Sequence, residues 1–224
     1  MTFPVRIDEI NGIRVVRDDL LPGGSKRRAL TPLLAELAAQ GWQEFVFGGP
    51  AEGYAQLALA HSANDVGVLA TYFVAQRKVL HRHTAEAMDN GANIVQVKHG
   101  RLNVVQARAR AYCEETGAYF FPLGFSTPEY EQRLTAHVKS AVTNLERPVT
   151  ETWCVAGSGL LARCLQAALP DAEHHAVRIG FVPQHGTAKL YDAPEQFGEN
   201  DETARRSEAP AMKPEPARLN GSAL

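Results

Sequence analysis

Lys26, which follows a glycine pair after one serine in Gly23-Gly24-Ser25-Lys26, is the residue of this sequence with the clearest potential for chemistry. An apolar run at 13–16 leads into this stretch, and an apolar helical pattern at 30–37 leads out of it. Glycine permits backbone conformations that a Cβ forbids and lets a flat ligand come close. A lysine where a loop meets a helix can be partly desolvated, which lowers its pKa and makes it a nucleophile toward an aldehyde. The same spacing is also typical of a plain turn followed by the basic start of a helix.

The elements that would position this lysine alternate between strand and helix. Residues 13–16 predict a first strand, and Thr31-Pro32 predicts a helix start, with threonine as N-cap and proline in the first turn, ending near Gly41. Further strands are expected at 43–47, 67–73, 94–97, 119–122, 151–156 and 177–182, and helices at 57–65, 79–90, 103–115, 129–145 and 160–169. Strands that are apolar on both faces predict an α/β fold in which helices cover mostly parallel sheets on both faces.

Two glycine-rich turns stand between a predicted strand and a predicted helix. They are Gly48-Gly49-Pro50-Ala51-Glu52-Gly53-Tyr54 and Gly157-Ser158-Gly159. Backbone N–H groups at such a junction point outward, and the helix dipole favours an anion there. Either turn could therefore bind a phosphate or a flat ring, although a lone G-S-G is often only a tight turn.

The stretch Arg17-Asp18-Asp19-Leu20, together with Gly23-Gly24-Ser25-Lys26-Arg27-Arg28, resembles the R-D-D-L…G-G-N-K-x-R-K-L signature of fold type II pyridoxal phosphate (PLP) enzymes. The closest branch is the 1-aminocyclopropane-1-carboxylate deaminase and D-cysteine desulfhydrase family. The resemblance extends over about residues 14–182 and implies a shortened, two-lobed fold like that of the tryptophan synthase β subunit. It also implies that Lys26 carries PLP as a Schiff base.

The glycine turns match the family only in part. Gly157, Ser158 and Gly159 align with the phosphate loop G-S-G-G-T, but leucines replace its last two residues. The turn at 48–54 aligns with G-G-x-Q-S-N-H. The resemblance gives Tyr54 the role of stacking on the cofactor ring. Glu52 brings a negative charge to the position where the resemblance would place the substrate carboxylate. Gly53 lacks the side chain of the family's asparagine, which bonds the ring hydroxyl of the cofactor. Glu52 and Gly53 are both candidates for contact with the substrate.

A partner for the pyridine nitrogen has no clear position in this sequence. The family places a serine, threonine or acid near the end of the chain, and the candidates here are Thr187, Tyr191, Asp192 and Glu195. Tyr191 is also a candidate for contact with the substrate. An acid at this position would make PLP a strong electron sink, whereas a hydroxyl would make it a weaker one.

The resemblance implies a PLP-dependent lyase or deaminase that acts on a small amino acid. One alternative is an enzyme for an amino-acid-modified nucleotide or DNA base, as in phage-type base modification, and another is a non-catalytic scaffold of the same fold. The larger, cofactor-binding lobe is expected at 1–39 and 121–198, the smaller lobe at 40–120 and a disordered tail at 199–224. Relatives of this fold are commonly dimers, so a homodimer is expected.

Composition narrows the possible partners. The net charge of −2 does not favour nucleic acid, and no apolar run is long enough for a membrane span. The three cysteines form no zinc-like cluster, and with no secretion signal they suit a reducing cytoplasm. Surface helix positions, rather than a metal site, are expected for His61, His81, His83, His174 and His175, and solvated helix faces for Arg77, Lys78, Arg82, Arg108 and Arg110.

Overall fold

The computed structural model describes residues 3–98, 100–179 and 184–193. Residues up to Tyr191 form one compact unit, and only 192–193 are described of the unit that follows it. The expected tail at 199–224, the expected strand end at 180–182 and the candidate Glu195 lie outside the described residues. Among the described helices, none combines the length and the apolar character that crossing a membrane requires.

A β-hairpin precedes the lysine loop. Strand β1 (Ile7–Ile10) pairs antiparallel with β2 (Ile13–Val16), and Asn11-Gly12 forms the turn between them. Both turn residues have positive φ, 52° and 78°, which suits the right-handed twist of a two-residue hairpin. The sequence predicts β2 and the turn correctly but gives no strand before them.

Helix α1 (Ser25–Ala39) carries Lys26 in its first turn, with Gly24 as N-cap. The expected helix start at Thr31-Pro32 is therefore wrong, because both residues lie inside α1. Burial of an apolar face that includes Leu30, Leu33 and Leu34 outweighs the backbone hydrogen bond that the proline removes. The Thr31 hydroxyl lies 2.9 Å from that of Ser62, which ties α1 to the next helix.

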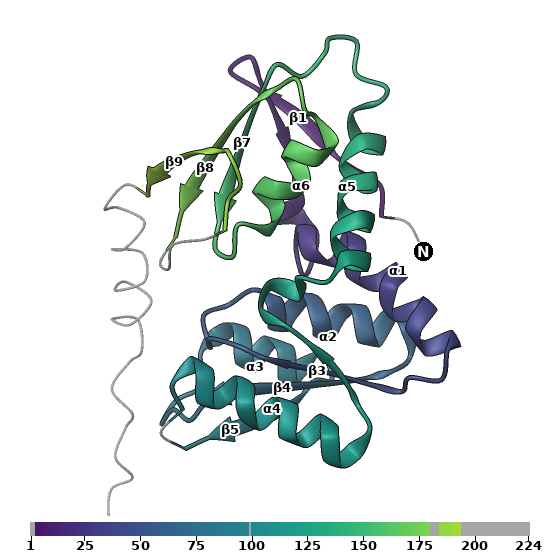
Figure 1. Cartoon of the computed structure of the whole chain (residues 1–224), viewed down its shortest axis with the longest axis vertical. Coiled ribbons are helices and arrows are strands. Elements are labelled where there is room, and N and C mark those ends of the chain that lie inside the picture. The colour runs from purple at the N-terminus through teal and green to yellow at the C-terminus, as the bar shows by residue number, and fades with distance from the viewer. Residues whose placement is uncertain (1–2, 99, 180–183, 194–224) are drawn as a thin grey trace, which may run out of the picture. The chain divides into compact units, whose positions relative to one another are not determined.

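A four-stranded parallel sheet in the order β5-β4-β3-β6 forms the layer beneath α1 and α2 in Figure 1. Its strands are β3 (Glu44–Gly48), β4 (Leu69–Ala75), β5 (Asn93–Val97) and β6 (Tyr119–Phe121), and its helices are α2 (Ala55–Val66), α3 (Arg82–Asp89) and α4 (Leu102–Thr116). Phe45 and Phe47 pack into one buried cluster, whereas Val46 packs with α4 on the other face. The two-sided apolar pattern of the strands thus correctly indicated a covered sheet.

A second sheet, in the order β7-β8-β9, follows helix α5 (Pro128–Val142). Its strands are β7 (Glu151–Ala156), β8 (Glu173–Arg178) and β9 (Lys189–Asp192), and α6 (Leu160–Ala168) connects β7 to β8. Small side chains, among them Ala156, Ala162 and Ala176, bring α6 close to one face of this sheet. The strand expected at 177–182 is misplaced, because β8 begins four residues earlier, where the sequence reads as polar.

Candidate functional site

The lysine loop owes its shape to two glycines. Gly23 and Gly24 have φ values of 86° and 65°, in the region that residues with a Cβ rarely adopt. A Cβ on Gly23 would lie 3.0 Å from the Cα of Ala58, so α2 could not pack as closely against any other residue. This close approach fixes where α1 begins and hence where Lys26 stands.

Lys26 lines a small cavity and is mostly shielded from solvent. Burial lowers the pKa of its amine below that of an ordinary lysine. Among the described residues, no acid forms an ion pair with it. The neutral, nucleophilic form of the amine is therefore more populated than in a solvated lysine.

The other wall of the same cavity is the turn between β7 and α6. Gly157, Ser158 and Gly159 line it, together with Ser25, Tyr130, Leu134, Val155, Leu160 and Leu161. The structure thus brings Lys26 and the predicted phosphate loop together across more than a hundred residues of sequence. The cavity measures about 70 Å³, compared with about 300 Å³ for a small ligand pocket.

Two residues from the segment after β6 support this site. Gly124 has φ of 74°, and a Cβ on it would lie 2.7 Å from the Ser158 Oγ, so the turn at Gly124 packs directly against the loop. The hydroxyl of Tyr130, on α5, donates to the backbone oxygen of Lys26 at 3.2 Å. Burial raises the pKa of Tyr130, which keeps this hydroxyl protonated as a donor.

The sequence resemblance did not point to Tyr130. In the sequence, Tyr130 reads only as one more apolar residue of α5. No local pattern could have indicated that its hydroxyl reaches the backbone of Lys26.

Tyr54 lies over the lysine loop from a third direction. Its ring is 3.4 Å from the position that a Cβ on Gly24 would occupy, and it stands edge-on to His83 with 5.1 Å between ring centres. The neighbouring Glu52 pairs with Arg77, and its backbone oxygen lies 2.9 Å from the Nδ1 of His83. Tyr54, Glu52 and Gly53 are not among the residues that line the lysine cavity.

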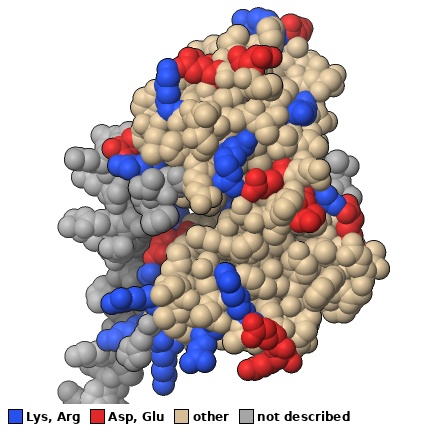
Figure 2. Space-filling model, in the orientation of Figure 1, with Lys and Arg blue, Asp and Glu red and all other residues tan. Residues whose placement is uncertain are grey.

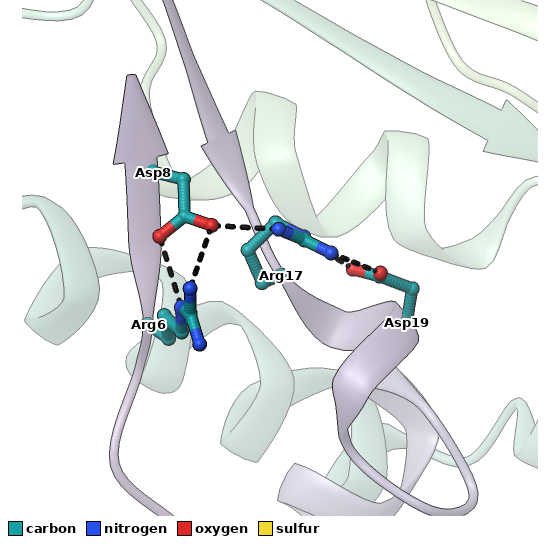
Figure 3. Close-up of polar contacts among 4 residues, drawn as sticks. All are labelled: Arg6, Asp8, Arg17 and Asp19. Carbon is teal, nitrogen blue, oxygen red and sulfur yellow. Dashed lines mark hydrogen bonds and ion pairs between the residues drawn. The ribbon is translucent and has the colours of Figure 1, made fainter. Parts of the chain in front are cut away.

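The charged residues of the lysine motif hold the loop in place through ion pairs. Asp18 pairs with Arg28, which is almost fully buried, at 2.7 Å, and Arg28 also donates to backbone oxygens at the start of the described chain. Asp19 pairs with Arg17, which also pairs with Asp8 (Figure 3). The Arg-Asp-Asp run thus fastens the hairpin to α1, and within the lysine motif Lys26 is the basic residue that forms no ion pair among the described residues.

Tyr191 lies apart from the lysine cavity. It sits on β9, where its hydroxyl is 3.1 Å from the Nδ1 of His175 and its ring packs against Trp153. His174 and His175 lie on strand β8 rather than on a surface helix, so the expectation for this pair is wrong. His175 is buried because it stacks on Trp153 at 4.3 Å between ring centres.

Comparison with solved structures identifies the class to which this fold belongs: the chain has the fold of the fold type II PLP-dependent enzymes. It superimposes on an ACC deaminase homologue with a TM-score of 0.73 at 16% identity, covering 85% of this chain and 71% of that one. A hydrogen sulfide-producing enzyme from Fusobacterium nucleatum gives a TM-score of 0.68 at 13% identity, with 90% and 80% covered.

A PLP-dependent aspartate racemase is a third structure with this fold. It gives a TM-score of 0.60 at 15% identity, and the match covers 78% of this chain and 56% of the racemase. A scan against known protein families and a search of curated proteins both find no match to the sequence. The likeness therefore rests on the fold, and the chain spans only part of each of these structures.

The residues present fit PLP at two of its ends. The desolvated amine of Lys26 suits the aldehyde, and the Gly157–Gly159 turn at the start of α6 offers donors to the phosphate. At the ring, Gly53 lacks the family's amide and Tyr54 stands at the edge of the loop. The cavity, at about 70 Å³, is smaller than the cofactor, so its walls would have to separate for PLP to enter.

Proposed function

We propose that this protein is a PLP-dependent enzyme of the lyase or deaminase type that acts on an amino acid. The shared cavity of Lys26 and the Gly157-Ser158-Gly159 turn is the observation that carries the proposal. A lysine and an anion-binding turn that face one space suit a cofactor with an aldehyde and a phosphate. PLP, when bound, supplies an electron sink for negative charge that develops on the substrate.

Three parts of the chain would have separate roles in holding the cofactor and in proton transfer. The amine of Lys26 would hold the cofactor and, once released, accept a proton from the substrate carbon at Nζ, since burial keeps it neutral more often. The backbone donors of 157–159 and the Ser158 hydroxyl would hold the phosphate. Tyr54 would cover the loop on its exposed side.

A non-catalytic scaffold of the same fold is the second candidate. It is favoured by Leu160 and Leu161, which bring apolar groups to the cavity where the family has Gly-Thr. Glycine at position 53 points the same way, because it cannot hydrogen-bond through a side chain. The two candidates differ in whether the cofactor binds at Lys26 at all.

An absorption titration with PLP separates them. The wild type is expected to develop a near-visible band that borohydride fixes onto the peptide containing Lys26, as mass spectrometry would show. Lys26→Ala should develop no such band, whereas the exposed control Lys139→Ala should behave as the wild type. Absence of the band from the wild type would favour the scaffold, and a band that persists in Lys26→Ala would move the site elsewhere.

Several finer points stay predictions. They are the division into lobes at 1–39 with 121–198 and at 40–120, the homodimer, the cytoplasmic location and the contact of Glu52, Gly53 and Tyr191 with substrate. A screen of amino acids for shifts of the bound cofactor band would identify the substrate. Comparison of Glu52→Gln with the wild type in that screen would test the substrate contact.

A further inference from the structure

Positive charge is concentrated in two segments of the chain. Residues 75–85 and 98–113 together contain seven lysines and arginines and no aspartate or glutamate, in a chain with 23 basic and 25 acidic residues. The seven are Arg77, Lys78, Arg82, Lys98, Arg101, Arg108 and Arg110. A net charge of −2 therefore hides a strongly basic region.

The parallel sheet brings the two segments together. Ala75 at the end of β4 pairs with Val97 at the end of β5, and the backbone N–H of Gln76 donates to Val97 at 2.9 Å. The backbone N–H of Arg77 also donates to the Gln96 side chain at 3.1 Å. The loops that follow these strands consequently leave the sheet side by side.

These loops form a basic edge, defined as Arg77, Lys78, Arg82, Lys98 and Arg101. All five residues are exposed, and the last four form no ion pair among the described residues. Figure 2 shows blue side chains gathered at the lower left, where β5 leads into α4. Arg77 and Lys78 precede α3, so the expectation of a solvated helix face is wrong for this pair.

Partly exposed rings adjoin this edge. Glu52 pairs with Arg77 and contacts His83 through its backbone oxygen, and His83 stands edge-on to Tyr54, which is 43% exposed. Nucleobases stack on such rings, while their phosphates bind lysine and arginine. Basic side chains beside exposed rings are the combination found in proteins that bind single-stranded DNA or RNA.

We propose that the basic edge binds single-stranded nucleic acid. Tyr54 also covers Gly24, two residues before Lys26, so a bound strand would pass beside the candidate site. The binding itself does not depend on the cofactor. An amino-acid group carried on a nucleotide would be the matching substrate class, and that part alone rests on the proposed function.

Fluorescence anisotropy with a labelled oligothymidylate, across a salt series, tests this. Each phosphate contact contributes about 0.7 to the slope of log affinity against log salt for single strands. Lys78→Gln/Lys98→Gln should lower that slope by about 1.4, whereas the charge-matched control Lys139→Gln/Arg147→Gln should leave it unchanged. No binding by the wild type at low salt, or an equal change in both variants, would overturn the proposal.

Two comparisons test the kind of partner. The wild type should prefer oligothymidylate to an abasic strand of equal length, and Tyr54→Leu should lose that preference. Binding to phosphatidylserine vesicles that the oligonucleotide does not displace would point to a membrane and against the proposal. Lys26→Ala should bind the strand as the wild type does. Strand binding can therefore be observed even if the absorption titration shows that PLP does not bind, and the two proposals can fail independently.

Discussion

At the scale of single residues, burial of Lys26 makes its amine more reactive but lowers the stability of the folded protein. Its ammonium form is disfavoured by burial and has no described ion-pair partner. The folded protein therefore binds this proton less readily than the unfolded chain does. Reactivity and stability make opposite demands at this position.

Replacement of Lys26 by methionine should consequently stabilise the protein when no cofactor is present. The gain should be largest at neutral pH and should shrink as the pH rises through the lowered pKa toward 10.5, where both states lose the charge. Thermal unfolding across this range would measure it. The exposed control Lys139→Met should show no such trend, and a destabilised Lys26→Met at neutral pH would contradict the argument.

Asp18 and Arg28 form the second residue-scale prediction. Arg28 is almost fully buried, so Asp18→Asn would leave its guanidinium with weakened pairing. We expect a loss of about 1–3 kcal/mol in the free energy of unfolding. Chemical denaturation would measure it, with the more exposed Asp19→Asn as the matched control. Equal effects of the two substitutions would show that burial of Arg28 is not the reason.

At the scale of elements, the turn between β6 and α5 determines the position of the phosphate loop. Gly124→Ala would add both the strain of a positive φ, about 1–2 kcal/mol, and a contact of 2.7 Å with Ser158. Gly91→Ala adds a similar strain at φ of 86° but meets nothing within 4 Å. Gly124→Ala should thus be the less stable variant and, alone of the two, weaken PLP binding in the absorption titration. Equal PLP affinities would show that the turn does not support the loop.

The hairpin β1–β2 is held through its charges as well as its strand pairing. Hydrogen bonds from Arg6 and then Arg17 lower the pKa of Asp8, so its contribution is present above pH 3.8 and is lost as the pH falls through the lowered pKa (Figure 3). Asp8→Asn should lower the urea midpoint slightly at neutral pH and converge with the wild type in acid. Asp171→Asn is the control, because Asp171 is exposed and forms no ion pair within the described part of the chain, and it should follow the wild type throughout. A difference that persists in acid would point to a role beyond charge.

At the scale of the whole molecule, burial protects all three thiols. The pKa values of Cys113 and Cys154 are raised to about 11, and that of Cys164 is also raised, in each case mainly by burial. A rise from 9 to about 11 means about 100-fold less thiolate at neutral pH. A colorimetric thiol reagent should therefore react slowly with the folded protein and with three thiols after denaturation. Rapid reaction of one thiol in the folded state would identify an exposed cysteine.

Much of the element order could be predicted from the sequence because the first sheet is covered on both faces. Its strands, such as β3 and β4, read as mostly apolar runs, and each begins shortly after a glycine. The start of α1 could not be predicted, because packing of Leu33 and Leu34 overrides the local signal of Thr31-Pro32. β8 begins with Glu173, His174 and His175, whose polar types conceal a strand that aromatic stacking stabilises.

The sequence predicted those parts of the candidate site that lie in glycine-containing turns. It did not predict contacts between side chains that are distant in the sequence. Lys26 and the turn at 157–159 carry local signals, and the structure places them around one cavity. The contact of the Tyr130 hydroxyl with Lys26 carries no local signal, because it depends on which elements the fold makes neighbours. The basic residues at 75–85 and 98–113 are visible in the sequence, but the pairing of β4 with β5 is needed to place them side by side. Tyr191 had a suitable type but lies on a strand away from this cavity.

The ion pair between Glu52 and Arg77 lies between the basic edge and Tyr54, the residue that covers the lysine loop. A phosphate that binds Arg77 competes with Glu52, so its arrival would free a carboxylate beside Tyr54. A cationic amino group near Lys26 would then meet a stronger negative field than in the unbound protein. Because linkage is reciprocal, a ligand that prefers the freed carboxylate would tighten the edge for phosphate by the same factor. If both proposals hold, one arginine that two anions compete for would make the affinity of each site depend on whether the other is occupied.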